Sequence, residues 1–325
     1  MVERIGITRR SFLAVSGQMI AGAATMGRFA ENADANAPSG LHTSVRDAHL
    51  SDVGEKDAWS ALRAIGARGV EVRVTTDLAC PDLFGPEKPY SIATNDDAKR
   101  LADDAQAQGL RISAFCMMNR FDENPEEELR WASRVASACK TIGVGAIRID
   151  VVPRRIKGDE FLPFAIKMCK QLVEATAETG VRFGIENHGG TTNQVEFLER
   201  LFDGVESERM GLTLDTGNFY WFGYPLSDLY GIYKKFASRV CHTHCKSVAY
   251  PEEQRNVRRP RGWEYAKYCC PIYEGDIDFA RVVAILREAG YRHDLCIENE
   301  SLGKFPREKR REVLAKEIEL LKQLI

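Results

Sequence analysis

Eight short β-rich runs, each separated from the next by an amphipathic helical stretch, constrain the fold of this chain more than any other feature. Such alternation predicts βαβ units and a parallel sheet, and eight strands are the number that a closed barrel requires. The sequence therefore predicts an α/β protein with a single-domain (β/α)8 TIM barrel. The predicted strands are residues 41–45, 69–74, 111–117, 146–152, 181–187, 211–215, 240–246 and 294–298.

The stretches between these runs carry helix signals. Pro125 and the acidic residues after it are typical of a first helical turn, and Gly180 is typical of a helix end. Residues 249–275 form a long polar and aromatic segment without such signals, and loops of that length in compact domains are usually functional. The predicted helices include residues 58–67, 125 onward, 161–179, 276–290 and 308–325.

The N-terminal region resembles a twin-arginine export signal. Arg9 and Arg10 precede Phe12 and Leu13, and a modest apolar stretch leads to small residues suited to cleavage at 33–35. We therefore assign residues 1–36 to an export signal and disordered segment, and residues 37–325 to the barrel. The apolar stretch is too short and too rich in Gly and Ser to span a membrane stably, so we expect a periplasmic or otherwise exported protein with no stable span after cleavage. The alternative is a tail with a chance arginine pair.

Composition excludes some classes of protein. The net charge is −2, so no basic surface indicates nucleic-acid binding. Nine cysteines lie mostly in apolar patterns, and this odd number favours buried thiols over a disulfide framework. Because the twin-arginine route carries folded proteins, buried thiols agree with export.

Metal-ligating side chains lie at the ends of the last four predicted strands. Glu186 ends the fifth strand, Asp215 the sixth and Glu298 the eighth, while the seventh carries His242 and His244 on one face. The active site of a (β/α)8 barrel lies at the C-terminal ends of its strands, so these groups are expected at one rim. Converging carboxylates repel one another unless a cation lies between them. The sequence predicts one divalent metal ion, with Mn2+ or Mg2+ favoured and Co2+ or Zn2+ as alternatives; polar strand ends by chance are the competing interpretation.

The order of four motifs makes a family resemblance definite. The chain resembles the xylose-isomerase-like TIM-barrel superfamily, which includes sugar phosphate isomerase/epimerase-type proteins, tagatose-3-epimerase-like enzymes, hydroxypyruvate isomerases and inosose dehydratases. The motifs are Glu186-Asn187-His188, Leu214-Asp215-Thr216-Gly217-Asn218, His242-Thr243-His244-Cys245-Lys246 and Ile297-Glu298-Asn299-Glu300. The resemblance implies that the metal ligands are Glu186, Asp215, His244 and Glu298.

Two departures from the family pattern concern the substrate contacts. Epimerases of this type tend to carry a histidine three residues after the aspartate, where this chain has Asn218. Many relatives carry an aspartate where Ser247 follows Lys246. The substrate contacts of the epimerase branch are therefore not carried over to this chain.

Enolisation chemistry follows from such a site. A metal that binds a carbonyl oxygen and the neighbouring hydroxyl acidifies the proton between them, and Glu186 and Glu298 are the natural pair to remove and return it. We expect a metal-dependent isomerase or epimerase that acts on a keto sugar or related polyol through an enediolate. The candidate substrate-binding residues are His188, Asn218, His242, Lys246 and Trp263. Glu71 and Asp150 are further candidates for the cavity, and Arg258, Arg259 and Arg261 are predicted to form a solvated loop face.

Other functions remain open from the sequence. The same metal and base could serve a lyase, either a dehydratase or an enzyme that cleaves 3-keto glycosides. A DNA-repair endonuclease of the endonuclease IV type shares the fold, but it needs several metals and many histidines, and this chain has six. A sugar-binding barrel without catalysis is the alternative from another class. The expected partner is a small carbohydrate or polyol and no nucleic acid; the sequence predicts no oligomeric state.

Overall fold

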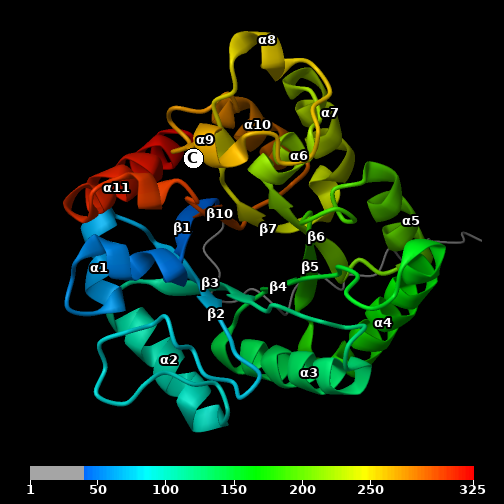
Figure 1. The fold of residues 1–325 in the computed structure, drawn as a ribbon. Coiled ribbons are helices and arrows are strands. Elements are labelled where there is room, and N and C mark those ends of the chain that lie inside the picture. The colour runs from blue at the N-terminus through cyan, green and yellow to red at the C-terminus, as the bar shows by residue number, and fades with distance from the viewer. Residues whose placement is uncertain (1–39) are drawn as a thin grey trace, which may run out of the picture. The chain divides into compact units, whose positions relative to one another are not determined.

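A computed structural model of the chain describes residues 40–325. Its central element is an eight-stranded parallel sheet in the order β10-β1-β2-β3-β4-β5-β6-β7, which curls into a barrel (Figure 1). The two outer strands of this order meet through a parallel bridge between Cys245 and Ile297, so the barrel is nearly closed. The strands are β1 (His42–Arg46), β2 (Gly69–Arg73), β3 (Arg111–Cys116), β4 (Ala146–Ile149), β5 (Arg182–Glu186), β6 (Met210–Asp215), β7 (Val240–His244) and β10 (Asp294–Ile297).

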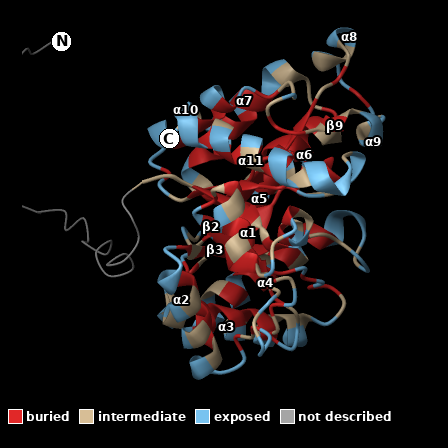
Figure 2. Cartoon of the chain, turned by 90° about the vertical axis from the view of Figure 1, so that its left-hand side faces the viewer, coloured by how far each residue is buried: buried red, intermediate tan, exposed pale blue. Residues whose placement is uncertain are grey.

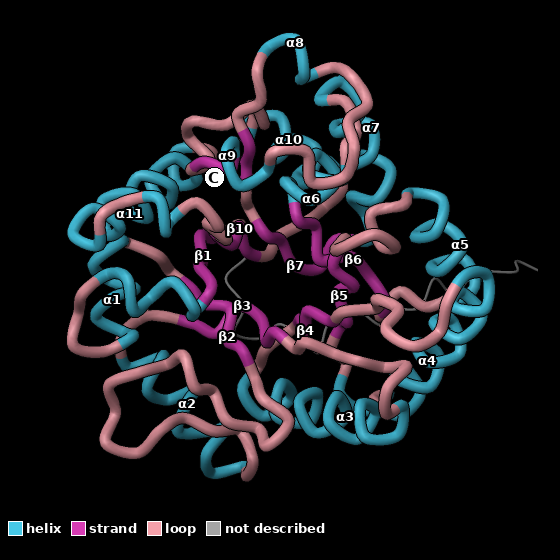
Figure 3. The backbone as a smooth tube through the Cα atoms, viewed as in Figure 1, coloured by secondary structure: helices cyan, strands magenta, loops and turns pink. Residues whose placement is uncertain are grey.

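Helices surround the barrel and connect successive strands (Figure 3). Several begin where a side chain caps the free backbone N–H groups: Asp57 accepts from Ser60 N at the start of α1, and Asp278 accepts from Arg281 N at the start of α10. The α-helices of the outer layer are α1 (Ala58–Ile65), α2 (Asn95–Ala107), α3 (Pro125–Ile142), α4 (Phe161–Ala175), α5 (Val195–Val205), α6 (Thr216–Phe222), α7 (Leu226–Phe236), α10 (Phe279–Glu288) and α11 (Arg307–Gln323). Short 3-10 helices occupy Asp47–Val53, Gly158–Glu160, Ala177–Thr179, Ala237–Arg239 and Leu302–Lys304.

The eight predicted strands are all present, so the predicted (β/α)8 fold is confirmed for the described residues. The core lies between the barrel and the inner faces of the helices, and Figure 2 shows it as the buried interior of the layered structure. Strands such as β6 are buried along their whole length, because helices cover one face and the barrel interior fills the other. This rigid frame fixes where each strand ends.

The segment at 249–275 has more structure than its sequence suggested. Just before the segment, β8 (Ser247–Val248) pairs antiparallel with β9 (Cys269–Cys270), which lies within it. The short helices α8 (Glu252–Arg255) and α9 (Tyr265–Tyr268) lie between these two strands in the chain. Arg259 corrects the prediction of a solvated loop face, because its side chain is buried and donates to the carbonyl oxygens of Tyr220 and Tyr224. Its guanidinium lies 4.4 Å from the ring centre of Tyr220 and 4.3 Å from that of Tyr250.

Among residues 40–325, no helix is long and apolar enough to cross a membrane. The export signal predicted for residues 1–36 lies outside the described residues, and it stays a prediction.

Candidate metal centre

Four side chains from consecutive strands meet at the C-terminal rim of the barrel. Glu186 ends β5, Asp215 ends β6, His244 ends β7, and Glu298 directly follows β10. Each offers one ligand atom, these four atoms lie within 4.8 Å of one another, and all four residues are buried. The structure therefore brings together the residues that the motifs nominated as metal ligands.

The atoms at the centre of this cluster lack ordinary hydrogen bonds. Asp215 Oδ2, His244 Nδ1 and Glu298 Oε2 are buried and make no hydrogen bond of acceptable geometry, although Lys246 Nζ lies 2.9 Å from Asp215 Oδ2. Buried polar atoms without partners are costly, and they are found where a ligand completes them. Three carboxylates and one imidazole are a donor set suited to Mn2+, Mg2+, Co2+ or Zn2+. The residues present therefore fit a divalent metal ion.

Charges around the cluster act differently on its carboxyl groups. Burial raises the pKa of Asp215 to about 8, and the nearby Lys246 only partly opposes that rise. Burial also works against ionisation of Glu186, but Arg148 and His244 outweigh it and bring the pKa of Glu186 below its ordinary value. The pKa of Glu298 is likewise lowered, since Lys246, His244 and Arg46 together overcome its burial. The neighbouring positive charges thus favour the ionised forms of Glu186 and Glu298.

Two arginines that the sequence did not reveal, the buried Arg148 and the partly buried Arg46, account for much of this effect. Arg148 on β4 pairs with Glu186 and lies 2.9 Å from Asp150 Oδ2, and Arg46 on β1 pairs with Glu298 and lies 2.9 Å from Glu71 Oε2. A signal for Arg148 was available, because Arg148 and Asp150 share one face at the end of an apolar strand. Arg46 directly follows the short strand predicted at 41–45, and no comparable pair of charged residues marks that strand end.

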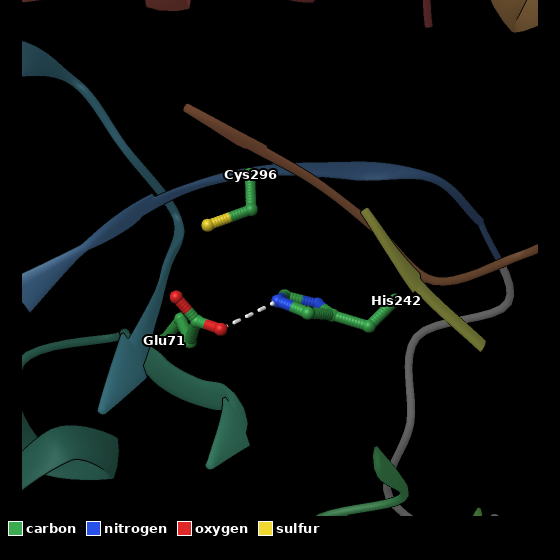
Figure 4. A group of neighbouring side chains, drawn as sticks. All are labelled: Glu71, His242 and Cys296. Carbon is green, nitrogen blue, oxygen red and sulfur yellow. Dashed lines mark hydrogen bonds and ion pairs between the residues drawn. The ribbon is translucent and has the colours of Figure 1, made fainter. Parts of the chain in front are cut away.

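His242 corrects one of the predicted substrate contacts. Its ring is fully buried, with Nδ1 2.9 Å from Asp294 Oδ1 and Nε2 3.1 Å from Glu71 Oε1, so neither nitrogen is available to a substrate. Figure 4 shows the contact between His242 and Glu71. Cys296 lies beside this pair and completes a group that could in principle hold a second metal. Because both ring nitrogens of His242 are already bonded, we assign the group a structural role below the metal centre.

Three further predicted substrate-binding residues, Asn218, Lys246 and Trp263, lie in different places. Asn218 is buried, its amide donates to Glu186 Oε1 at 3.0 Å, and its backbone N–H donates to Asp215 Oδ1 at 2.8 Å, so it holds two of the proposed ligands. Lys246 Nζ lies 3.1 Å from Glu298 Oε2 and 3.0 Å from Glu300 Oε1. Trp263 instead packs in the 249–275 segment, where its ring stacks on Tyr268 with the centres 5.7 Å apart.

His188 lies at the edge of the cluster. Its Nδ1 is 2.9 Å from Asp150 Oδ1, and its side chain is 46% exposed. The hydrogen bond to Asp150 raises the pKa of His188, and this effect exceeds the opposing effect of burial. Ligand atoms of His188, Asp150 and Glu186 lie within 4.8 Å of one another, so this partly exposed histidine borders the proposed ligand Glu186.

Sequence comparison finds related proteins over part of the chain. The rhizopine catabolism protein MocC of Rhizobium meliloti is 29% identical over 155 residues, which are 45% of this chain and 45% of that protein. An inosose dehydratase of Clostridium perfringens is 28% identical over 129 residues, which are 38% of this chain and 42% of that enzyme. The chain thus matches less than half the length of these curated relatives.

Comparison with solved structures finds the same fold over most of the chain. The IOLI protein with a bound zinc atom has a TM-score of 0.63 at 17% identity and covers 88% of this chain and 99% of its own. A D-allulose 3-epimerase from Methylomonas sp. in complex with D-allulose has a TM-score of 0.60 at 14% identity and covers 89% and 98%. A Mycobacterium smegmatis barrel in complex with magnesium has a TM-score of 0.61 at 15% identity and covers 82% and 88%. The family model described as xylose isomerase-like TIM barrel matches residues 59–324, and the chain belongs to this family.

Proposed function

We propose that the protein is a metal-dependent enzyme that removes a proton next to the carbonyl group of a keto sugar or related polyol, with isomerisation or epimerisation as the outcome. One observation carries the proposal: four ligand atoms of Glu186, Asp215, His244 and Glu298 converge in a buried cluster. Positive charges nearby lower the pKa of Glu186 and Glu298, which favours their carboxylate forms. The named relatives support the substrate class, because they include an inosose dehydratase and a D-allulose 3-epimerase. The zinc and magnesium in similar barrels support a divalent ion.

Each residue of the site would have a distinct role in this reaction. Glu186, Asp215, His244 and Glu298 would hold the metal, which when bound supplies Lewis-acid polarisation of the substrate carbonyl. Glu186 Oε1 and Glu298 Oε2 are the carboxylate oxygens that no arginine holds, and each lies within 3.6 Å of His244 Nδ1. One of these glutamates can accept the α-proton and the other can return it to the neighbouring carbon. The ammonium group of Lys246 stands beside both Asp215 and Glu298, where it can stabilise a developing oxyanion.

Dehydration is a second candidate, and the pair of His188 and Asp150 favours it. A partly exposed imidazole, held through Nδ1 by a buried carboxylate, keeps Nε2 free to donate a proton to a departing hydroxyl group. Enolisation is common to both outcomes, so the base and metal residues keep the same roles. The reactions differ only in whether a β-hydroxyl leaves before the proton returns.

Solvent exchange tests the proposal. The Mn2+-loaded protein in D2O is incubated with a panel of keto sugars, inososes and 3-keto glucosides, and deuterium next to the carbonyl is followed by NMR. We expect exchange with at least one compound, and a fall of about 100-fold or more when Glu186→Gln or Glu298→Gln removes a base. Glu317→Gln is the matched control, because Glu317 is equally buried but bonds to Ile272 N and Asn299 instead of the cluster. An active Glu186→Gln variant would end the assignment.

The variant His188→Asn separates the two outcomes. If the enzyme is a dehydratase with His188 as the acid, water loss falls while deuterium exchange continues. If it is an isomerase or epimerase, the product retains all its oxygen atoms in both proteins.

A further inference from the structure

We propose that Glu71, Arg46 and Arg148 are positioning residues that decide which single atom each neighbouring metal ligand presents. The inference rests on the proposed metal centre, but it concerns residues that lie outside the ligand set. Each of the three residues is charged, each reaches a ligand from a different strand, and each occupies one side of that ligand.

Glu71 fixes the orientation of His244. His244 Nε2 lies 2.9 Å from Glu71 Oε1, while His244 Nδ1 lies 3.3 Å from Glu298 Oε2 and 3.6 Å from Glu186 Oε1. An ionised carboxylate only accepts hydrogen bonds, so when the His244 ring is neutral its proton stays on Nε2 and the lone pair of Nδ1 is directed at an ion in the centre. Without Glu71, the ring could take the other tautomer and present an N–H where a metal needs a lone pair.

Glu71 is itself held from two further sides. Its Oε1 is 3.1 Å from His242 Nε2, and Arg46 Nε is 2.9 Å from its Oε2. His242 is in turn fixed by Asp294, which accepts a 2.6 Å hydrogen bond from Ser44 Oγ. This network links β1, β2, β7 and β10, so the orientation of His244 depends on the frame of the barrel.

The two arginines orient the proposed glutamate ligands, as Glu71 orients His244. The Arg148 guanidinium holds Glu186 Oε2 and is anchored by Asp150 Oδ2 and Met117 O, both at 2.9 Å. Arg46 holds Glu298 Oε1. Glu186 Oε1, which accepts from the Asn218 amide, and Glu298 Oε2, which lies beside Lys246, are the oxygens that no arginine holds, although a free carboxylate can bind an ion through both oxygens. The arrangement would therefore favour binding of an ion through one oxygen of each glutamate and one nitrogen of His244.

Metal binding provides a test that does not depend on turnover. In full-length protein stripped with chelator, Mn2+ affinity is measured by calorimetry and the visible absorption spectrum is recorded with Co2+. We expect Glu71→Gln, Arg46→Met and Arg148→Met each to weaken Mn2+ binding about 10- to 100-fold. We expect Arg148→Met also to change the Co2+ spectrum, because Glu186 becomes free to bind through both oxygens. Arg148→Lys keeps the positive charge but loses the several fixed N–H donors of the guanidinium, so it should restore only part of the Mn2+ affinity.

Matched controls separate positioning from general damage. Glu317→Gln removes a buried carboxylate that bonds none of the four proposed ligands, and Arg209→Met removes an arginine that bonds Val181 O, Val173 O and Thr176 Oγ1. Both controls should retain the wild-type affinity and Co2+ spectrum. Where a methionine or glutamine variant does not fold, Arg148→Lys and Glu71→Asp carry the comparison. Unchanged affinity and spectrum in the folded variants would overturn the positioning role, whereas a wild-type protein that binds no metal would overturn the proposed function itself.

Discussion

His49 is a histidine whose neutral form the fold requires. Its Nε2 accepts a 3.1 Å hydrogen bond from the backbone N–H of Asn299, and a protonated ring could not accept that bond. Burial, with a contribution from the positive charge of Arg46, lowers the pKa of His49 to about 4 from the ordinary 6.5. The bond ties the segment before α1 to the residue that follows Glu298.

This lowered pKa predicts a specific loss of stability in acid. The pKa of His49 is lower in the folded state than in the unfolded state, so its contribution is complete above pH 6.5 and is lost as the pH falls toward 4. The loss is at most about 3.5 kcal/mol, because each tenfold difference in proton affinity between the two states corresponds to about 1.4 kcal/mol. We expect the decrease in unfolding free energy between pH 7 and pH 4.5, measured by urea titration, to be smaller in His49→Gln than in the wild type. His42, whose pKa burial also lowers to about 4, titrates in the same range, so the pH dependence should shrink without vanishing. Equal pH dependence in both proteins would contradict this role for His49.

Single residues also show what the sequence could and could not reveal about the site. Glu186, Asp215, His244 and Glu298 were accessible because strand ends in a parallel barrel share one rim, so their position along the chain implies their position in space. Arg46 was not accessible, since its pairing with Glu298 joins residues 252 apart in the chain. His242 was misjudged because alternation places it on the inner face of the strand but does not say how deep in the barrel it lies.

At the scale of elements, Arg259 fastens the 249–275 segment to the barrel helices. Its guanidinium is buried and lies against the rings of Tyr220 and Tyr250. It donates to the carbonyl oxygens of Tyr220, in α6, and Tyr224, just after it. Arg259 N also donates to Gly223 O, and Gly223 has φ 107°, where a Cβ atom would collide with the Arg259 carbonyl. The segment is therefore held at one point by several bonds.

Removing that side chain should loosen the segment. We expect Arg259→Ala to lower the free energy of unfolding by about 2–4 kcal/mol, through the loss of two cation–π contacts and several hydrogen bonds to carbonyls. Hydrogen exchange should accelerate across residues 249–268 more than in the barrel strands. Arg258→Ala is the matched control, because Arg258 is exposed over the ring of Tyr224 and its removal should cost under about 1 kcal/mol. If both variants behave alike, the buried contacts of Arg259 do not hold the segment.

The elements themselves were predictable in order but not at every boundary. The strand predicted at 146–152 ends at Ile149, and the strand predicted at 240–246 ends at His244. In both cases the strand ends where polar residues of the site begin, and the apolar pattern in the sequence does not mark that boundary. The helix predicted at 161–179 ends at Ala175 and continues as a 3-10 turn, where Thr176 Oγ1 donates back to Leu172 O. Arg259 was read as solvated because its aromatic partners Tyr220 and Tyr250 come from two distant segments.

The whole molecule carries its cysteines as buried thiols, as the sequence indicated. All nine are free in the structure, eight are buried, and Cys270 is partly exposed. Burial raises the pKa of Cys80, Cys116 and Cys169 to about 12, which leaves almost no reactive thiolate at neutral pH. A fold of this size is stable without cross-links, so the thiols need no oxidation to maintain the barrel.

The burial of the thiols predicts how slowly they react with an oxidising reagent in the folded protein. With an aromatic disulfide reagent at pH 7.5, we expect no more than one thiol, Cys270, to react in the native state, and all nine to react in guanidinium chloride. Because access to the other thiols requires unfolding, their rate of reaction should follow the rate of unfolding and not the reagent concentration. Oxidised glutathione should leave the melting temperature of the native protein unchanged, and Cys270→Ser should remove the fast phase of labelling. Rapid native labelling of several thiols would mean that the barrel opens far more readily than its packing implies, and such a protein would need reducing conditions to keep its thiols free.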